Sequence, residues 1–216
     1  MPNIKPINLE AFVGTYSDDS NNHIETGVPI DINIYGSNNN ITIIGDNKSI
    51  CYRITVYNNS TISIGNHVTA NMAQKLELST ADNSVIEIGN NTTFVNKCRI
   101  YAGTGSKISI GHNCMFSTDI LVSCNPVIAE ITSCNNSINV NDYVWVGWGA
   151  SLQQGCNINK GCIVAAQAVV ENEFPANSLI AGDPAKIIRS NVTWHRNNME
   201  YDINAVPDEY RTISNT

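Results

Sequence analysis

Aliphatic side chains recur at every sixth position in the C-terminal half of the chain. The series is Val140, Val146, Leu152, Ile158, Val164 and Val170. A period of six fits neither a helix with 3.6 residues per turn nor one isolated strand. It is typical of a repeat architecture in which each hexapeptide forms one side of a coil. Three hexapeptides, as from Val140 to Ile158, make one 18-residue turn of a triangular coil.

The same spacing occurs upstream in groups of three, separated by extra residues. The groups are Ile44, Ile50, Val56; Ile64, Ala70, Leu76; Ile88, Phe94, Ile100; and Ile110, Phe116, Val122. We expect the extra residues to form loops, with the longest excursion near residues 123–139. The repeat predicts one inward column made of Ile44, Ile64, Ile88, Ile110, Val140 and Ile158.

A second inward position lies four residues after each aliphatic residue. Its occupants are mostly small or β-branched, namely Val68, Thr92, Cys98, Cys114, Val144, Ala150, Cys156, Cys162 and Ala168. Gly often follows the aliphatic residue directly and Asn is frequent after it, at turns where left-handed backbone costs these residues little. One large and one small inward residue per hexapeptide predict a narrow all-β prism of parallel strands.

The ends of the chain depart from this repeat. Residues 1–27 are expected to be an irregular or capping segment, and Ile30, Ile32 and Ile34 to form the first strand of a domain over 28–189. Residues 184–198 are expected to form a short closing helix, with Pro184 in its first turn. Residues 190–216 are expected to form a C-terminal tail after the domain, and the part beyond the helix, 199–216, is expected to be polar.

Composition favours one soluble domain. The chain has 216 residues, 42% of them hydrophobic, and no apolar run that approaches the length of a membrane span. Its N-terminus lacks the layout of a signal peptide, so a cytoplasmic location is expected. The net charge of −7 argues against nucleic acid and anionic membranes as partners. We interpret the cysteines at the second inward position as reduced, compact apolar fillers, and we expect no metal.

Two C-terminal motifs carry a resemblance to a known family. They are Asp-Tyr-Val-Trp-Val-Gly at 142–147 and Ile-Ala-Gly-Asp-Pro-Ala-Lys-Ile-Ile-Arg at 180–189. The chain resembles the hexapeptide-repeat acyltransferases, and in particular bacterial sugar and capsule O-acetyltransferases of the polysialic acid type. Asn-Val-Thr-Trp-His-Arg at 191–196 is similar to the tail of that branch. The resemblance implies a left-handed parallel β-helix, a homotrimer, acetyl-CoA as acyl donor and a saccharide acceptor.

The resemblance also implies roles for individual residues. Trp145 matches the tryptophan that positions the thioester or its oxyanion. Gly147 and Trp148 lie where relatives contact the pantetheine arm, and Ala166 and Gln167 match a turn whose backbone donors contact it. Lys186 and Arg189 match the basic residues that meet the phosphates of coenzyme A. Each has a plainer interpretation, because an outward aromatic residue also suits subunit packing and a basic tail is commonly solvated.

The family's catalytic histidine has no counterpart at the matching position. That position is Asn125, before Pro126, and an amide does not accept a proton near neutral pH. Three accounts stay open: a His→Asn substitution in this chain, a degenerate member that binds without turnover, or an amine acceptor that needs positioning more than a base. The corresponding alternative functions are a sugar-amine N-acetyltransferase and a catalytically degenerate binding protein.

Other side chains are weaker candidates for the chemistry. His23, His67, His112 and His195 fit turn or surface positions better than the position of a base. Cys124 and Cys134 are at neither inward position of the repeat. They lie near the expected catalytic loop, where a thiolate would be a nucleophile. A zinc site like that of the γ-class carbonic anhydrases would need three histidines, and the spacing of His23, His67 and His112 does not fit one.

Overall fold

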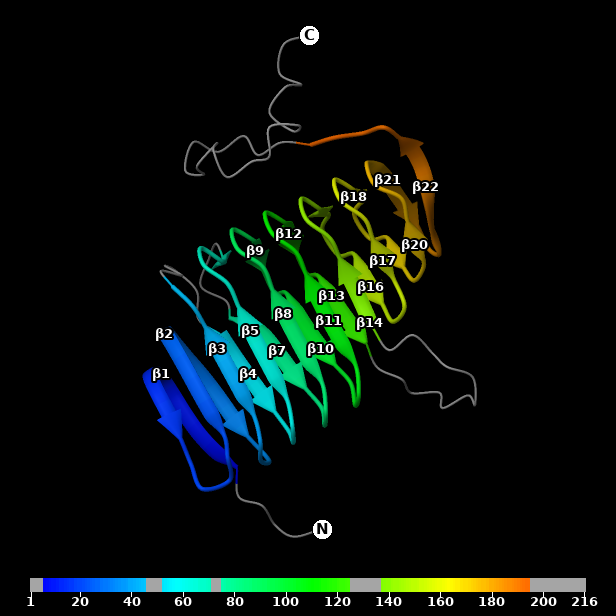
Figure 1. The fold of residues 1–216 in the computed structure, drawn as a ribbon. Coiled ribbons are helices and arrows are strands. Elements are labelled where there is room, and N and C mark those ends of the chain that lie inside the picture. Colours follow the sequence, from blue (N-terminus) through cyan, green and yellow to red (C-terminus); the bar gives the residue numbers. More distant parts are fainter. Residues whose placement is uncertain (1–5, 46–51, 71–74, 125–136, 195–216) are drawn as a thin grey trace, which may run out of the picture.

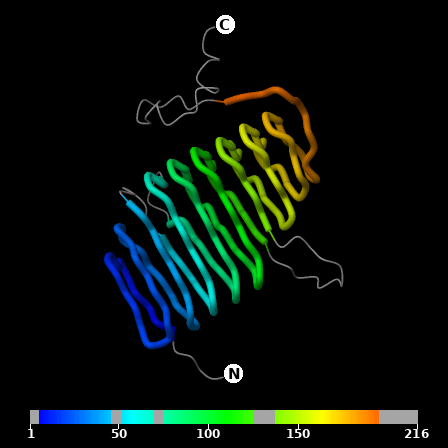
Figure 2. The backbone as a smooth tube through the Cα atoms, in the orientation of Figure 1, coloured from blue at the N-terminus to red at the C-terminus, as the bar shows by residue number. Residues whose placement is uncertain are grey.

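The described part of the chain is built from β-strands alone. The computed structural model describes residues 6–45, 52–70, 75–124 and 137–194, and no helix occurs in these ranges. The strands form a row of stacked coils with β1 at one end and β22 at the other (Figures 1 and 2). Most strands pair in parallel with a strand of the neighbouring coil, as the hexapeptide period predicts.

Three stacks of strands make up the coils, and we call them faces A, B and C. Face A contains the Ile30–Ile34 part of β2 (His23–Ile34), β4 (Tyr52–Val56), β7 (Leu76–Thr80), β10 (Arg99–Ala102), β13 (Leu121–Cys124), β16 (Ser151–Gln153) and β19 (Val169–Val170). Face B contains the His23–Thr26 part of β2, β3 (Asn40–Ile43), β5 (Thr61–Ile64), β8 (Val85–Ile88), β11 (Lys107–Ile110), β14 (Ser137–Val140), β17 (Asn157–Ile158) and β20 (Glu173–Phe174). Because β2 pairs with both β3 and β4, faces A and B form one continuous sheet.

Face C is a separate seven-stranded sheet. Its strands are β6 (Thr69–Ala70), β9 (Thr93–Asn96), β12 (Met115–Thr118), β15 (Trp145–Val146), β18 (Ile163–Val164), β21 (Ser178–Gly182) and β22 (Ala185–Ser190). From β7 to β20 the chain visits faces A, B and C in turn. We call the corners AB, BC and CA after the faces that the chain leaves and enters.

The core is the column of aliphatic residues that the repeat predicts, with one correction. Ile64, Ile88, Ile110, Val140 and Ile158 pair in consecutive register and are buried. Burying each such side chain contributes about 1.5–3 kcal/mol.

The place of Ile44 in this column was predicted wrongly. Ile43 pairs with Ile64, whereas Ile44 is 52% exposed. Successive side chains of a strand point to opposite faces, so a phase error of one residue exchanges inside and outside. Ile50 lies outside the described residues.

The small inward positions are filled as expected. All nine predicted occupants, from Val68 to Ala168, are buried. The thiols of Cys98, Cys114 and Cys162 each donate a hydrogen bond to a backbone carbonyl of the next coil, at 3.2, 3.1 and 3.1 Å. These cysteines therefore fill volume in the prism and also link adjacent coils.

The N-terminal flank is more regular than expected. Ile7–Ser17 forms β1, a strand antiparallel to β2, and Ile7, Leu9, Phe12 and Tyr16 pack against the core. Ile30, Ile32 and Ile34 lie in a strand as predicted, but it is the second one. Tertiary pairing explains the difference, because β1 provides hydrogen-bond partners for the end of the stack.

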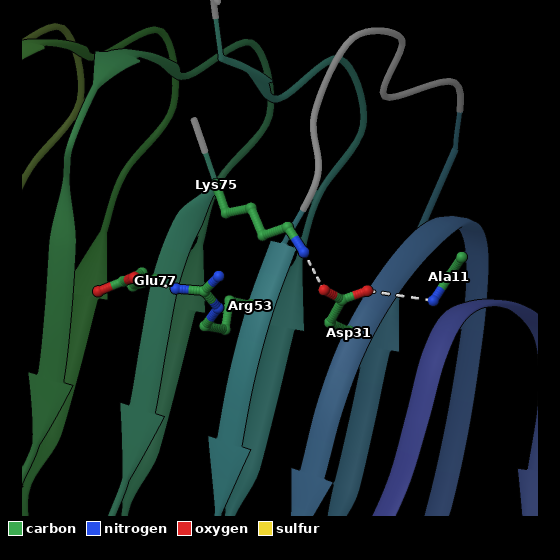
Figure 3. Close-up of polar contacts among 5 residues, drawn as sticks. All are labelled: Ala11, Asp31, Arg53, Lys75 and Glu77. Atoms are coloured by element: carbon green, nitrogen blue, oxygen red, sulfur yellow. Dashed lines mark hydrogen bonds and ion pairs between the residues drawn. The ribbon is translucent and has the colours of Figure 1, made fainter. Parts of the chain in front are cut away.

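A polar network holds this N-terminal strand to the next coils. The carboxylate of Asp31 on β2 accepts a hydrogen bond from the backbone N–H of Ala11, 3.1 Å away, and forms an ion pair with Lys75 (Figure 3). Arg53 on β4 forms an ion pair with Glu77 on β7 at 2.7 Å. Ala11 lies at an irregularity of β1, where its φ is 46°. Asp31 therefore stabilises the strand at its least regular point.

The short C-terminal helix was predicted wrongly for the residues that the structure describes. Ala185–Ser190 forms β22, which turns back antiparallel on β21. The backbone groups of β21 would otherwise form an open sheet edge, and β22 pairs with them. The β-branched residues Ile187 and Ile188 also suit an extended backbone. Residues 195–198 of the expected helix lie outside the described residues.

Candidate functional site

Trp145 lies on the outer surface of face C. Its neighbour Val146 points into the core, so the alternation of β15 directs the Trp145 side chain outward, where it is half-buried. The indole N–H donates a hydrogen bond to the hydroxyl of Ser117 on the preceding coil, at 3.4 Å. This contact fixes the tilt of the ring while leaving part of its surface accessible.

A second tryptophan from the C-terminal segment packs beside Trp145. Trp194 is buried, its ring centroid is 6.1 Å from that of Trp145, and it stacks on Tyr143 at 4.6 Å. Its indole N–H donates to the backbone carbonyl of Tyr143 at 2.9 Å. In the sequence, Trp194 stands out only as part of the motif at 191–196. No local pattern links it to Tyr143, because 51 residues separate the two.

The CA corner next to Trp145 carries the residues expected to contact pantetheine. Gly147 packs so closely on the next coil that an added Cβ would lie 2.7 Å from the Ala166 nitrogen, so this position requires glycine. Trp148 follows it and is 50% exposed. The carbonyl of Trp148 accepts a hydrogen bond from the Gln167 N–H at 2.8 Å. The structure therefore brings these four residues together on adjacent coils.

The turn at Ala166 and Gln167 presents backbone groups to solvent. Both residues are exposed, and Gln167 has a φ of 61°. Within the described residues, no acceptor receives a hydrogen bond from the Ala166 N–H. A free backbone donor on a corner beside an exposed tryptophan suits an elongated amide-containing ligand.

Lys186 and Arg189 lie on β22, at the C-terminal end of face C. Lys186 pairs with Ala181 and Arg189 with Leu179, and both basic side chains are exposed. Ala181 directly follows Ile180, whose carbonyl accepts from the Ala165 N–H at 2.8 Å. Lys186 is thus near the same corner as Ala166, whereas Arg189 is about 10 Å further along the strand at about 3.3 Å per residue.

Asn125, Cys134 and His195 lie outside the described residues. The described neighbour Cys124 ends β13 on face A, and its side chain is buried. Cys124 therefore points into the core, contrary to the sequence prediction that it lies at neither inward position of the repeat. Burial raises the pKa of the Cys124 thiol above its ordinary value, which disfavours the thiolate needed for nucleophilic attack.

The described histidines occupy corners and strand ends. His112 accepts a hydrogen bond from the Asn90 N–H at its Nδ1, at 2.8 Å, and its own backbone N–H donates to the Asp142 carboxylate at 2.7 Å. His23 contacts the Ser17 hydroxyl at 2.9 Å. His67 lies on a BC corner with a φ of 55°. These contacts give His112 and His23 structural partners in corner and hairpin packing.

Among the described residues, no group of three or more His, Cys, Asp or Glu side chains lies close enough together to hold a metal ion. Within the same ranges, no helix is long and apolar enough to cross a bilayer.

Comparisons with known proteins show what this chain is similar to, although no protein-family model matches it. A Schizosaccharomyces pombe protein whose assigned name is acetyltransferase is 33% identical over 88 residues, 38% of this chain and 42% of the relative. Polysialic acid O-acetyltransferase of Escherichia coli O1:K1 / APEC is 30% identical over 96 residues, 41% of this chain and 31% of the relative. The match thus spans less than half the length of these curated relatives.

A solved structure shares the fold over most of both chains. The polysialic acid O-acetyltransferase OatWY superimposes with a TM-score of 0.55 and 24% identity, covering 80% of this chain and 95% of that chain. The chain is therefore similar in sequence to acetyltransferases and in fold to a polysialic acid O-acetyltransferase, as its two C-terminal motifs indicate.

Proposed function

We propose that this chain is a hexapeptide-repeat acyltransferase that moves the acetyl group of acetyl-CoA to a hydroxyl of a saccharide. The proposal includes left-handed coils, as the resemblance implies. The observation that carries it is the succession of Trp145, Trp148, Gln167 and Lys186 along one edge of face C. Sequence similarity to acetyltransferases supports the same reaction class.

The CA corner suits the elongated arm of the donor. Trp148 offers a half-exposed ring, and the Ala166 N–H is a donor without an acceptor among the described residues. A pantetheine arm has amide carbonyls that accept such hydrogen bonds and a methylated segment that packs on an aromatic ring. Gly147 keeps the two coils close, so the arm would lie along a continuous edge.

The basic residues of β22 suit the other end of the donor. Lys186 and Arg189 are exposed, and the spacing between them along one strand, about 10 Å, allows contacts to separate phosphates. Charge-assisted hydrogen bonds to phosphate are stronger than neutral ones. With the phosphates at β22 and the arm along the CA corner, the thioester would lie near Trp145.

The reaction itself exchanges one bond for another. The acceptor oxygen attacks the thioester carbonyl carbon, the carbon–sulfur bond breaks, and the acceptor proton ends on the departing thiolate. Trp145 is fixed by Ser117 and flanked by Trp194, which suits the positioning of the thioester. Such positioning lowers the activation barrier of acetyl transfer, and it does not require the Trp145 side chain to gain or lose a proton.

Asn125 occupies the sequence position of the family's general base. Its amide can hold the acceptor by hydrogen bonds but cannot take up the proton near neutral pH. We therefore propose that transfer to a hydroxyl is slow in this chain, and that a base restored at position 125 accelerates it.

The proposed assembly is a homotrimer with active sites between subunits. The outer surface of face C has a column of half-buried apolar side chains, formed by Met115, Trp145, Ile163 and Leu179. Trp148 adds a large exposed ring at its edge. Such a surface favours docking of a second copy, which would enclose the donor site from the open side.

Acetyl transfer by the parent chain and by Asn125→His tests the proposal. Each is supplied with acetyl-CoA and a panel of sugars, and thiol release is followed together with the mass of the acetylated product. General-base assistance is worth about 100-fold or more, and the gain should appear as imidazole loses its proton near pH 6–7. A Trp145→Ala version of the Asn125→His chain should lose the gain.

The products also separate the alternatives. Rapid transfer to an amino sugar by the parent chain, with little gain from Asn125→His, would identify an N-acetyltransferase. Saccharide and coenzyme A binding without transfer in either variant would identify a degenerate binding protein. No thiol release and no coenzyme A binding in any variant would contradict the acyltransferase assignment.

A further inference from the structure

A short segment after β22 crosses the BC corner, and we call residues 191–194 the strap. The Val192 N–H donates to the Asn177 carbonyl at 2.9 Å, and the Trp194 indole N–H donates to the Tyr143 carbonyl at 2.9 Å. Successive coils carry Tyr143, Gly161 and Asn177 at one corner position. The strap therefore runs back along the corner over two coils, or about 10 Å, since neighbouring coils are about 4.8 Å apart.

The corner position in the middle of this path carries no side chain. Gly161 is buried and has a φ of 74°, whereas the same position on other coils holds asparagine, histidine or tyrosine. Glycine at this place lets the strap lie close to the coil. The Trp194 ring stacks on Tyr143 with 4.6 Å between centroids, and Trp194 is only 5% exposed. Its side chain therefore offers almost no surface to a ligand.

The strap connects the two ends of the proposed donor site. It follows β22, whose Lys186 and Arg189 are assigned to the phosphates, and it ends where the Trp194 ring lies 6.1 Å from that of Trp145. This distance is within the usual range for interacting aromatic rings, about 4.5–7 Å between centroids. One continuous segment of the chain therefore reaches from the phosphate end of the site to the residue assigned to the thioester.

Ser117 holds the Trp145 ring at its N–H edge only. That hydrogen bond is 3.4 Å long, beyond the usual range of about 2.7–3.2 Å, and β15 contains only two residues. The outer side of the ring is open to solvent, because Trp145 is half-buried. Trp194 approaches from the BC corner and excludes the orientations that would turn the indole towards that corner. Contacts from two distant parts of the chain therefore set one orientation of the ring.

We propose that Trp194 is a positioning residue for acetyl transfer, which holds the Trp145 indole in the orientation in which the thioester reacts. This inference rests on the proposed function. Trp194 acts through Trp145 and does not touch the donor, because its own side chain is buried. A displacement of about 1 Å at a reacting centre costs up to roughly 100-fold in rate, so a loosened Trp145 slows the chemical step. Donor affinity changes little, because other residues are assigned to the phosphates and to the pantetheine arm.

Fluorine NMR of the full chain labelled with fluorotryptophan reports the orientation of Trp145 directly. The chain has three tryptophans, and Trp145→Phe assigns the Trp145 resonance. Trp194→Leu, which keeps an apolar side chain but removes the ring, should broaden or split that resonance. Trp194→Phe keeps a ring on Tyr143 and should restore most of the parent line shape. Phe174→Leu is the matched control, because it removes a buried ring from face B and should leave the resonance unchanged.

Kinetics then separate a positioning role from a purely structural one. Acetyl transfer and coenzyme A binding are measured in the parent chain and in its Asn125→His version, well below the unfolding midpoint. In each, Trp194→Leu should lower kcat about tenfold or more and change the dissociation constant of coenzyme A by less than about twofold. Trp194→Phe should recover most of kcat, and Phe174→Leu should leave it unchanged.

The proposal is overturned if Trp194→Leu leaves the Trp145 resonance unchanged, if Phe174→Leu disturbs that resonance equally, or if Trp194→Leu leaves kcat unchanged. A loss of coenzyme A affinity that accounts for the whole effect on transfer would also overturn it. No acetyl transfer in any variant, together with the expected change of the Trp145 resonance, would contradict the proposed function while the contact between Trp194 and Trp145 stands.

Discussion

Trp194 stacks on Tyr143 with 4.6 Å between ring centroids, and its indole donates to the Tyr143 carbonyl at 2.9 Å. Tyr143 has a φ of 59°, a left-handed conformation that bulky residues rarely adopt. The corresponding corner positions are occupied by His67, Asn91, Asn113, Gly161 and Asn177. The stacking therefore offsets the backbone cost at Tyr143, and it holds Trp194 beside Trp145.

Removal of the buried tryptophan should destabilise the C-terminal coils. We expect Trp194→Ala to lower the free energy of unfolding by about 3–5 kcal/mol, the usual range for a buried aromatic residue. Urea unfolding followed by circular dichroism measures this change. Trp148→Ala is the control, because that ring is half-exposed and its loss should cost about 1 kcal/mol or less. Equal losses in the two variants would refute the stacking role of Trp194.

The left-handed corners should distinguish glycine from β-branched residues. Asn113 has a φ of 57°. Asn113→Val should lower the free energy of unfolding by about 1–2 kcal/mol because its Cβ branches crowd the backbone there. Asn113→Gly should change it by only a few tenths of a kcal/mol. Thermal unfolding of both variants is the measurement, and similar midpoints would show that the corner does not require this backbone.

The buried thiols should make the fold sensitive to alkali. Burial raises the pKa of Cys98 to about 11 and of Cys156 to about 12. A folded-state pKa above the unfolded value of about 8.5 contributes stability that is present below that value and lost as pH rises through the folded pKa. The urea midpoint should therefore fall between about pH 9 and 12.

Two measurements check the thiol prediction. A Cys156→Ala variant should show a shallower fall of the urea midpoint with pH than the parent chain. Mass spectrometry after maleimide treatment at pH 8 should find Cys98 and Cys156 unmodified in the folded protein and modified in urea. Rapid labelling of either thiol in the folded protein would contradict their burial.

Asp31 should make the N-terminal strand sensitive to acid. The hydrogen bond from Lys75, followed by that from the Ala11 N–H, holds the pKa of Asp31 below its usual value. Stability from a lowered pKa is present above about pH 3.9 and is lost as pH falls through the folded pKa. Asp31→Asn should therefore speed hydrogen exchange of β1 at pH 7, and the difference from the parent should shrink as the pH falls below about 3.9.

Glu77→Gln is the comparison for this network. It breaks the Arg53–Glu77 pair, whose side chains are 53% and 43% exposed, and exposed pairs contribute little. Exchange in β1 should stay near the parent rate. A larger effect from Glu77→Gln than from Asp31→Asn would show that the Ala11 contact does not hold the strand.

The interior of the fold was predictable because its period is long and regular. From Ile64 onward the sixfold spacing places every described large residue correctly in the core. It fails at Ile44, where two isoleucines are adjacent. The alternation within Asn40–Ile43 contains the missing signal, because Ile41 and Ile43 share one face. The same alternation from Ile24 to Ile34 marks the long strand that the sequence interpretation shortened.

Contacts between distant segments were not predictable in this way. β1 and β22 each cover an open sheet edge, and that edge exists only once the neighbouring coils have folded. The stacking of Trp194 on Tyr143 likewise depends on tertiary placement. The residues matched to the donor site of the family do lie together on face C and its corner, namely Trp145, Gly147, Trp148, Ala166 and Gln167.

Calorimetric titration with coenzyme A tests the central claim, that the CA corner of face C holds an acyl donor. The parent chain should bind coenzyme A with a dissociation constant between about 1 μM and 1 mM, and Lys186→Ala should weaken binding about three- to tenfold through the loss of a phosphate contact. Lys107→Ala, on face B, should leave the dissociation constant unchanged. No binding at millimolar coenzyme A, or equal affinity in the Lys186→Ala variant and the parent, would contradict the account.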